Sequence, residues 1–365
     1  MTKKVLLALI LLCNMAYAQE DSTTVEDEFD FSDFELATEP AKSFCTNKVL
    51  GQLPTTLVGL QYTFQAPHDF TAGNLVGEDA QNIAEENNIN ATHGWSFITN
   101  LPIISRNNIL INANLTYSEQ HYNFEENNSA HPFTKSVSGV GLRSLNTLFT
   151  VFKPLNSKNF ILGQVGFSIN GNYAFGDFQP LNTTRVPIAA LYGWKASDKL
   201  MYAFGLSRTY LGGALNYVPI AYYYRTFNDN WGMEALLPAR ALVRYRFSTQ
   251  EVLSFGFNVN GNTYRIDNFS NNAVGIPNGP AKNALLAAED VELRRSEILL
   301  GLTYQRALSG FFWISLETGY RINYSYELDE GGDFARPFGN DKAYFIENTL
   351  GNPIYFQIGI SYVSP

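Results

Sequence analysis

The chain has 365 residues and a formal net charge of -9, with 14% aromatic and 16% charged residues. A mean hydropathy of -0.13 excludes a protein built mainly of membrane helices, and the aromatic content excludes wholesale disorder. A pI near 5.0 argues against a nucleic-acid partner, which requires a basic face.

Residues 1–18 have the three parts of a secretory signal peptide. Lys3 and Lys4 precede an apolar stretch too short to span a bilayer, and Ala16-Tyr17-Ala18 forms a small-x-small cleavage site. We therefore expect export with cleavage after residue 18. Cys13 leaves with this segment, so Cys45 is the only cysteine of the expected mature chain and no internal disulfide can form.

Residues 19–55 are the second predicted region, an acidic disordered tail in the periplasm. Nine Asp and Glu residues and no Lys or Arg lie between residues 20 and 39. A block of like charge cannot pack on itself and predicts disorder. Phe29, Phe31 and Phe34 leave open a docking role, on a periplasmic partner or in a lumen, beside the plainer interpretation of a solubilising leader.

Residues 56–365 alternate apolar and polar residues with period two, as in Ser315 against Leu316. The predicted strands exceed ten residues, whereas strands of soluble proteins usually have about five or six. Tight turns at 156–158, 197–199, 248–250 and 309–310 alternate with long polar connections around 67–91, 125–137, 267–292 and 329–351. This pattern favours an all-β transmembrane antiparallel barrel, with short periplasmic turns and longer extracellular loops, over a soluble β-protein.

The strand count depends on how one segment is interpreted. Twelve strands are expected, within a range of 10–14, at approximately 57–66, 92–102, 109–124, 138–153, 159–176, 183–195, 200–211, 215–226, 251–266, 293–308, 311–328 and 352–363. Segment 231–247 resembles strand but is broken at Pro238, which cannot donate a ladder hydrogen bond. It is either a hairpin of two short strands, which gives fourteen, or a bent element outside the wall.

Charged residues on the faces opposite the apolar ones are the candidate site. Charge is tolerated there only if water or a partner meets it inside the barrel. A constriction that tunes solute passage and a structural ladder of cross-strand pairs are both consistent with these residues. The ladder is expected between strand 293–308, with Arg295 and Glu297, and its neighbour 311–328. The predicted lumen charges are Arg185, Arg225, Glu234, Arg244, Arg246, Arg295, Glu297, Glu317 and Arg321.

Other candidate sites are weaker. The histidines His68, His93, His121 and His131 fall in or beside predicted loops, but their spacing is not that of a metal site. The acidic loop with Asp329, Glu330, Asp333 and Asp341 lacks the ligand spacing of a calcium loop. No cofactor, metal or catalytic residue is predicted. Within loop 267–292, residues 281–291 after Pro280 predict a short helix, which either covers the mouth or packs on neighbouring loops.

The chain resembles the uncharacterised outer-membrane β-barrel families of Gram-negative bacteria. The resemblance rests on the end of the signal at Ala16-Tyr17-Ala18, the alternating strand 311–328, the break at Leu237-Pro238-Ala239 and the aromatic-rich final strand. It implies residence in the outer membrane in contact with its lipid. The expected function is a channel or transporter for a small solute. The alternatives are an enzyme at the external rim acting on lipid or envelope substrate, and a structural or interaction barrel; the oligomeric state stays open.

Overall fold

The structure, a computed structural model, describes residues 43–75, 82–126, 129–173, 184–209, 216–276, 278–288, 291–330 and 345–364. All of them belong to one compact unit that runs from residue 42 to the C-terminus. The predicted signal peptide and the acidic block at 20–39 lie outside the described residues.

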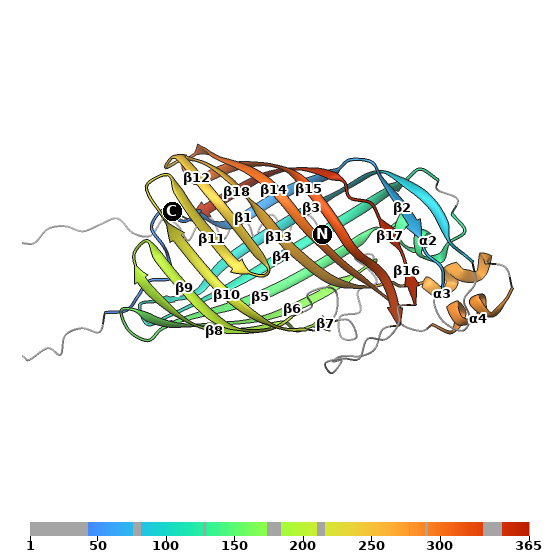
Figure 1. The fold of residues 1–365 in the computed structure, drawn as a ribbon, viewed down its shortest axis with the longest axis horizontal. Coiled ribbons are helices and arrows are strands. Elements are labelled where there is room, and N and C mark those ends of the chain that lie inside the picture. Colours follow the sequence, from blue (N-terminus) through green and yellow to red (C-terminus); the bar gives the residue numbers. More distant parts are fainter. Residues whose placement is uncertain are drawn as a thin grey trace, which may run out of the picture. The chain divides into compact units, whose positions relative to one another are not determined.

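In the described residues the wall is a closed ring of fourteen antiparallel strands, in which the last strand pairs with the first (Figure 1). Closure pairs the backbone groups of each strand with two neighbours, so the ring leaves no open edge. The strands of the ring are β1 (Thr55–Gln65), β3 (Glu85–Arg106), β4 (Ile109–Phe124), β5 (Leu142–Pro154), β6 (Asn159–Gly171), β8 (Ile188–Ser197), β9 (Leu200–Thr209), β10 (Asn216–Thr226), β11 (Trp231–Leu237), β12 (Arg240–Ser248), β13 (Glu251–Arg265), β14 (Val291–Ser309), β15 (Phe312–Glu330) and β18 (Ile354–Ser364).

The barrel class agrees with the sequence prediction, but the count of twelve strands is wrong. Segment 231–247 forms the hairpin β11–β12, which turns at Pro238 and Ala239 and lies within the wall between β10 and β13. Proline cannot donate a ladder hydrogen bond, so the chain turns there instead of continuing as one long strand. The hairpin interpretation of this segment, which gives fourteen strands, is the one that the structure supports.

The outer face of the ring is apolar and the inner face is polar. Leu316 is 46% exposed on the outside, and its cross-strand neighbours Tyr304 and Ile358 belong to the same outward row. On the inside of the same strand, Trp313 and Arg321 are buried. Exposed aromatic residues on the outer face include Trp95, whose ring is tilted against that of Tyr62 at 4.8 Å between ring centroids. An apolar outer surface with aromatic residues is typical of a barrel that meets hydrocarbon.

The two ends of the barrel differ. The tight turns predicted at 156–158, 197–199, 248–250 and 309–310 are confirmed and lie at the end where β1 begins and β18 ends, which we call the short-turn end (Figure 1). The opposite, long-loop end has the helices α2 (Pro132–Ser138), α3 (Phe269–Asn272) and α4 (Pro280–Ala287), the 3₁₀ turn η3 (Ala273–Gly275), and the short strands β2 (His68–Ala72), β7 (Thr184–Arg185), β16 (Ile346–Glu347) and β17 (Thr349–Leu350). Among the described residues, no helix is long and apolar enough to cross a membrane.

The helices at the long-loop end pack into an apolar core with the upper ends of the strands. Phe133 of α2, Phe269 of α3 and Leu285 of α4 are buried in one cluster with inward residues such as Tyr264 and Tyr326. The helix predicted after Pro280 is confirmed as α4, and it packs on neighbouring loops and strands. We call this cluster the apolar cap.

The alternation of faces can be tested with a matched pair of substitutions. Leu316→Arg places a charge against lipid and should lower the free energy of unfolding by about 2–4 kcal/mol if the position lies near the midplane. Gln305→Arg adds the same side chain on the inner face, where Gln305 lines a cavity together with Glu317, and should change stability by less than about 1 kcal/mol. Equilibrium unfolding in phospholipid vesicles measures both. Equal losses in the two variants would contradict the assignment of faces.

Candidate functional site

Residues 43–54, which precede β1, lie at the short-turn end of the barrel, partly inside it and partly exposed, as at Leu50. Cys45 and Val49 are buried in a cluster with inward residues of the wall, among them Phe160, Leu191 and Met201. The sequence analysis assigns these residues to the acidic tail at 19–55. Their packing against the wall could not be inferred from the alternation of apolar and polar residues. We call residues 43–54 the lumen segment.

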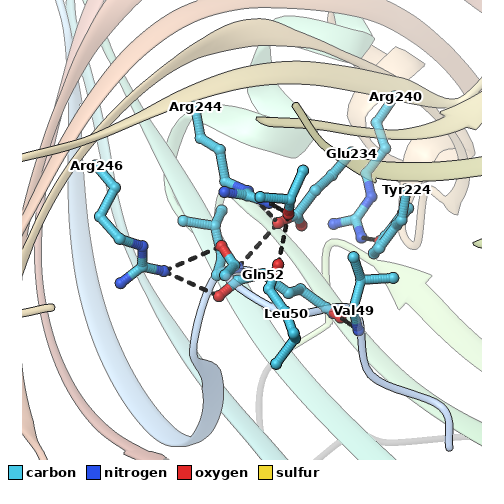
Figure 2. Close-up of polar contacts among 11 residues, drawn as sticks. Val49, Leu50, Gln52, Tyr224, Glu234, Arg240, Arg244 and Arg246 are labelled. Carbon is cyan, nitrogen blue, oxygen red and sulfur yellow. Dashed lines mark hydrogen bonds and ion pairs between the residues drawn. The ribbon is translucent and has the colours of Figure 1, made fainter. Parts of the chain in front are cut away.

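The backbone of the lumen segment is held by hydrogen bonds from the wall (Figure 2). Arg246 donates from Nη2 to the carbonyl oxygens of Gly51, at 3.2 Å, and Gln52, at 3.0 Å. The amide of Leu53 donates to Oε1 of Glu234 at 2.9 Å. At the turns, the amide of Leu50 donates to the carbonyl of Asp198 at 2.8 Å. The wall therefore binds mainly main-chain groups of this segment.

Glu234 is fixed in turn by Arg244, which is only 1% exposed. Arg244 Nε lies 3.1 Å from Glu234 Oε1, and its Nη2 donates to the hydroxyl of Thr226 at 2.6 Å. That hydroxyl donates to the carbonyl of Leu50. Gly232 leaves room for the guanidinium, because a Cβ at this position would lie 2.3 Å from the Arg244 Cζ atom. These residues form one network that ends on the lumen segment.

A second group of charges lies deeper in the barrel. Glu297 accepts at Oε2 from Arg295 Nη2 and Arg321 Nη1, each at 2.6 Å, while its Oε1 accepts from Asn260 at 3.3 Å. Arg295, Glu297 and Arg321 are 4%, 6% and 7% exposed. The ladder predicted between β14 and β15 therefore exists for Arg321 and Glu297. We call Arg295, Glu297 and Arg321 the central charge cluster.

Three of the predicted lumen charges lie outside both networks, although Glu317 still lines a cavity of the lumen. Glu317 does not pair with an arginine; it accepts from Thr303 at 3.0 Å and from the hydroxyl of Tyr355 at 2.6 Å. Arg185 of β7 pairs with Glu292 near the start of β14. Arg225, expected in the lumen, is exposed on the outer face of β10, where its guanidinium lies 5.3 Å from the ring of Phe227.

The error at Arg225 has a physical cause. Tyrosines at positions 222, 223 and 224 occupy both faces of β10, so the alternation that identifies faces elsewhere is absent there. The inward row is set by Tyr224, which accepts from Arg240 at 2.7 Å, and by Thr226.

The histidines and the acidic loop have structural contacts. His131 caps α2: its Nδ1 accepts from the amide of Phe133 at 3.3 Å, and its Nε2 donates to the carbonyl of Gly73 at 3.1 Å. His93 stacks on His121. Asp329 pairs with Arg294, while residues 333 and 341 lie outside the described residues. No group of three or more metal-ligating side chains suited to a metal ion occurs in the described part of the chain.

Besides the cavity that Leu53, Gln305 and Glu317 line, two adjacent cavities lie in the lumen of the described structure. One, of about 190 Å³, is lined by the central charge cluster and by polar residues that include Gln120 and Asn260. The other, of about 300 Å³, lies beside the β11–β12 turn, where the wall is low because Arg240 pairs with Asn258 while β13 continues to Arg265. Asn260 and Asn262 line both cavities, which makes the two spaces adjacent.

The closed ring, the apolar outer face and the polar lumen together define a membrane-spanning β-barrel. No protein-family model matches the sequence. No curated protein matches it.

Solved outer-membrane proteins are similar at low identity. A FadL homologue of Pseudomonas aeruginosa is 10% identical over 85% of this chain and 90% of that chain, with a TM-score of 0.41. An outer-membrane channel of Pseudomonas putida F1 is 9% identical over 86% of this chain and 97% of that chain, with a TM-score of 0.36. The KdgM porin in complex with disordered oligogalacturonate is 7% identical over 84% of this chain and 99% of that chain, with a TM-score of 0.31. At these values the similarity bears on neither solute nor mechanism.

The central charge cluster predicts an asymmetry between two substitutions. Glu297→Gln leaves two buried arginines without a counter-charge and should lower the free energy of unfolding by about 3–5 kcal/mol. Arg321→Gln leaves the pair of Arg295 and Glu297 intact and should lower it by less. Urea titrations in vesicles compare the two variants. An equal or larger loss in Arg321→Gln would show that Glu297 is not the residue on which the cluster depends.

The cap formed by His131 predicts a pH dependence at the long-loop end. Burial lowers the pKa of His131 to about 4, against 6.5 in the unfolded chain. Because the pKa of His131 is lower in the folded state, the unfolded state takes up a proton at higher pH than the folded state does. The stability that the His131 cap gives α2 is therefore complete above pH 6.5 and is lost as the pH falls toward 4.

Hydrogen exchange over residues 129–138 measures this loss. After correction for the intrinsic rate, protection should fall by at least about tenfold between pH 7 and pH 4.5. His131→Asn keeps an N-cap acceptor that does not titrate, so its protection should be independent of pH. The same pH dependence in both variants would assign the effect to another group.

Proposed function

We propose that the protein is a gated passage for a small solute across the outer membrane, and that the lumen segment is its closure at the short-turn end. The observation that supports this proposal is a polar lumen occupied by a stretch of main chain that belongs to no strand of the wall. Removing this stretch breaks no pairing within the ring, since all of its residues precede β1.

The strength of the contacts fits a closure that can be released. A hydrogen bond to a charged group contributes about 1.5–3 kcal/mol and a neutral one about 0.5–1.5 kcal/mol. The three bonds from Arg246 and Glu234 to the lumen segment therefore sum to about 4.5–9 kcal/mol, which a partner that binds the open form can supply. The ring of paired strands is far more stable than this.

The proposal includes an orientation. The wall begins at Thr55 and ends at Ser364 on the short-turn side, and we assign this side to the periplasm and the long loops to the exterior. Residues 1–18 would be removed on export, and the acidic residues that follow would lie in the periplasm, next to the lumen segment in sequence. A partner that pulls on this acidic tail would act directly on the closure.

Planar-bilayer recordings of three purified proteins test the proposal. The mature chain should be closed, with rare brief openings. Removal of residues 19–42 leaves the lumen segment in place and should not change this behaviour. Removal of residues 19–54 takes away the closure, so the open probability should rise at least about tenfold, as expected when a few kcal/mol of contacts are lost.

Folding must be checked in each sample by the heat-dependent shift in gel mobility. A folded barrel without residues 19–54 that never conducts would contradict the passage and would favour a structural barrel.

A further inference from the structure

The central charge cluster is unbalanced. It contains two guanidinium groups and one carboxylate, so its net charge is +1, and all three side chains are more than nine-tenths buried. Glu119 also lines the cavity, but its carboxylate is engaged by the hydroxyl of Tyr117 at 3.0 Å and lies near Arg143 and His121. A buried positive charge without a counter-ion is unfavourable unless a ligand or water meets it.

Three hydrogen-bond donors in or beside the central charge cluster have no acceptor in the described structure. They are Nε of Arg295, Nε of Arg321 and Nε2 of Gln120. The orientation of Gln120 is fixed, because its Oε1 accepts from Arg295, which can only donate. The amide nitrogen of Gln120 is therefore the group left over. Buried donors are almost always satisfied in folded proteins, so three together at one cavity indicate a missing acceptor.

The cavity beside these donors has room for a ligand. Its volume of about 190 Å³ is well above the roughly 10–15 Å³ that one water molecule requires. Apart from Glu119 and the apolar Leu142, the remaining lining is mostly polar and uncharged, and it includes Ser118, Ser144 and Gln357. A site that combines excess positive charge, unpaired N–H donors and neutral polar walls is complementary to a small anion that accepts several hydrogen bonds.

We propose that the central charge cluster is a binding site for a small carboxylate. One carboxylate oxygen would accept from Arg321 and the other from both Gln120 and Arg295, which neutralises the net charge and satisfies the three unpaired donors. The further statement that a carboxylate is the solute that passes through the barrel rests on the proposed function. Binding of a carboxylate does not require passage.

The choice of a carboxylate over other ligands follows from the donor set. A cation would meet two arginines and only one carboxylate, which is already bonded to both. A neutral amide would accept the hydrogen bonds but leave the positive charge in place. Discrimination among three molecules of similar size and different charge is therefore the direct test.

The test uses the folded mature chain in detergent micelles with propionate, propionamide and propylammonium as probes. Binding is measured by equilibrium dialysis at constant ionic strength. Propionate should bind at least about tenfold more tightly than propionamide, because it gains charge-assisted hydrogen bonds, and propylammonium should not bind. Equal binding of propionate and propionamide would overturn the proposal.

Three variants locate the site. Arg321→Gln brings the net charge of the cluster to zero and should weaken propionate binding about tenfold or more. Gln120→Leu removes one unpaired donor without changing charge and should weaken it by a smaller factor; it serves as the second variant if Arg321→Gln does not fold. Arg240→Gln is the control, because this arginine bonds Tyr224 and lines a different cavity.

Unchanged binding in both Arg321→Gln and Gln120→Leu would place the anion elsewhere and overturn the assignment. The result is separable from the test of passage. A barrel that binds propionate but never conducts after removal of residues 19–54 would reject only the passage, and one that conducts without binding would reject only the site.

Discussion

The structure depends on closure of the strand ring. In hydrocarbon no water is present to bond a free N–H or C=O, so a sheet can span only if its last strand returns to its first. Here β18 pairs with β1 over most of both strands, which satisfies that requirement. Closure also separates an outer face, which must be apolar, from an inner face, which may carry charge. The buried arginines and carboxylates exist only because the ring isolates them from lipid.

The interior is the second consequence of closure. A ring of fourteen strands lies between barrels filled by their own side chains, at about eight strands, and open channels, at sixteen or more. This one is filled from both ends. The apolar cap packs Phe133, Phe269 and Leu285 at the long-loop end and leaves a cavity beside the low wall at the β11–β12 turn, while the lumen segment closes the short-turn end through its main chain. The space left between them is polar and carries the central charge cluster.

The two closures differ in chemistry. The cap buries a large apolar cluster, so opening it exposes apolar side chains to water. The lumen segment is held largely by hydrogen bonds to its backbone and by a smaller apolar cluster around Cys45 and Val49. When the lumen segment leaves, its main-chain hydrogen bonds are replaced by bonds to water at a net cost of about 0.5–3 kcal/mol each. This difference is the reason for placing the gate at the short-turn end.

The sequence predicted the barrel because period-two alternation is a local signal that most of the long strands carry, as in 312–324. It predicted which end has tight turns from residues such as Ser309 and Gly310. It did not predict the position of residues 43–54, since contacts between a segment and distant carbonyl-binding side chains such as Arg246 leave no pattern in the segment itself.

The sequence predicted the charged residues of the candidate site only in part. Charges on a regular strand, such as Glu297 and Arg321, could be assigned to the lumen from their parity, and Arg225 could not, because its strand has tyrosines on both faces. Gln120 and Asn260 gave no signal: neutral polar residues are ordinary on an inner face, and only the structure shows which of them meet the cluster.

The central claim, that the lumen segment is a movable closure, can be tested through Cys45. Its thiol is buried against the wall, and burial raises its pKa, so a polar maleimide should react slowly with the closed protein. The measurement is the current through bilayer-inserted mature chain while a bulky polar maleimide is added on the short-turn side, with Cys45→Ser as control. We predict slow modification, with each event converting a closed barrel to a persistently conducting one, because the adduct cannot return to its place against Phe160 and Leu191. Rapid modification of closed barrels, or modified barrels that stay closed, would contradict the account.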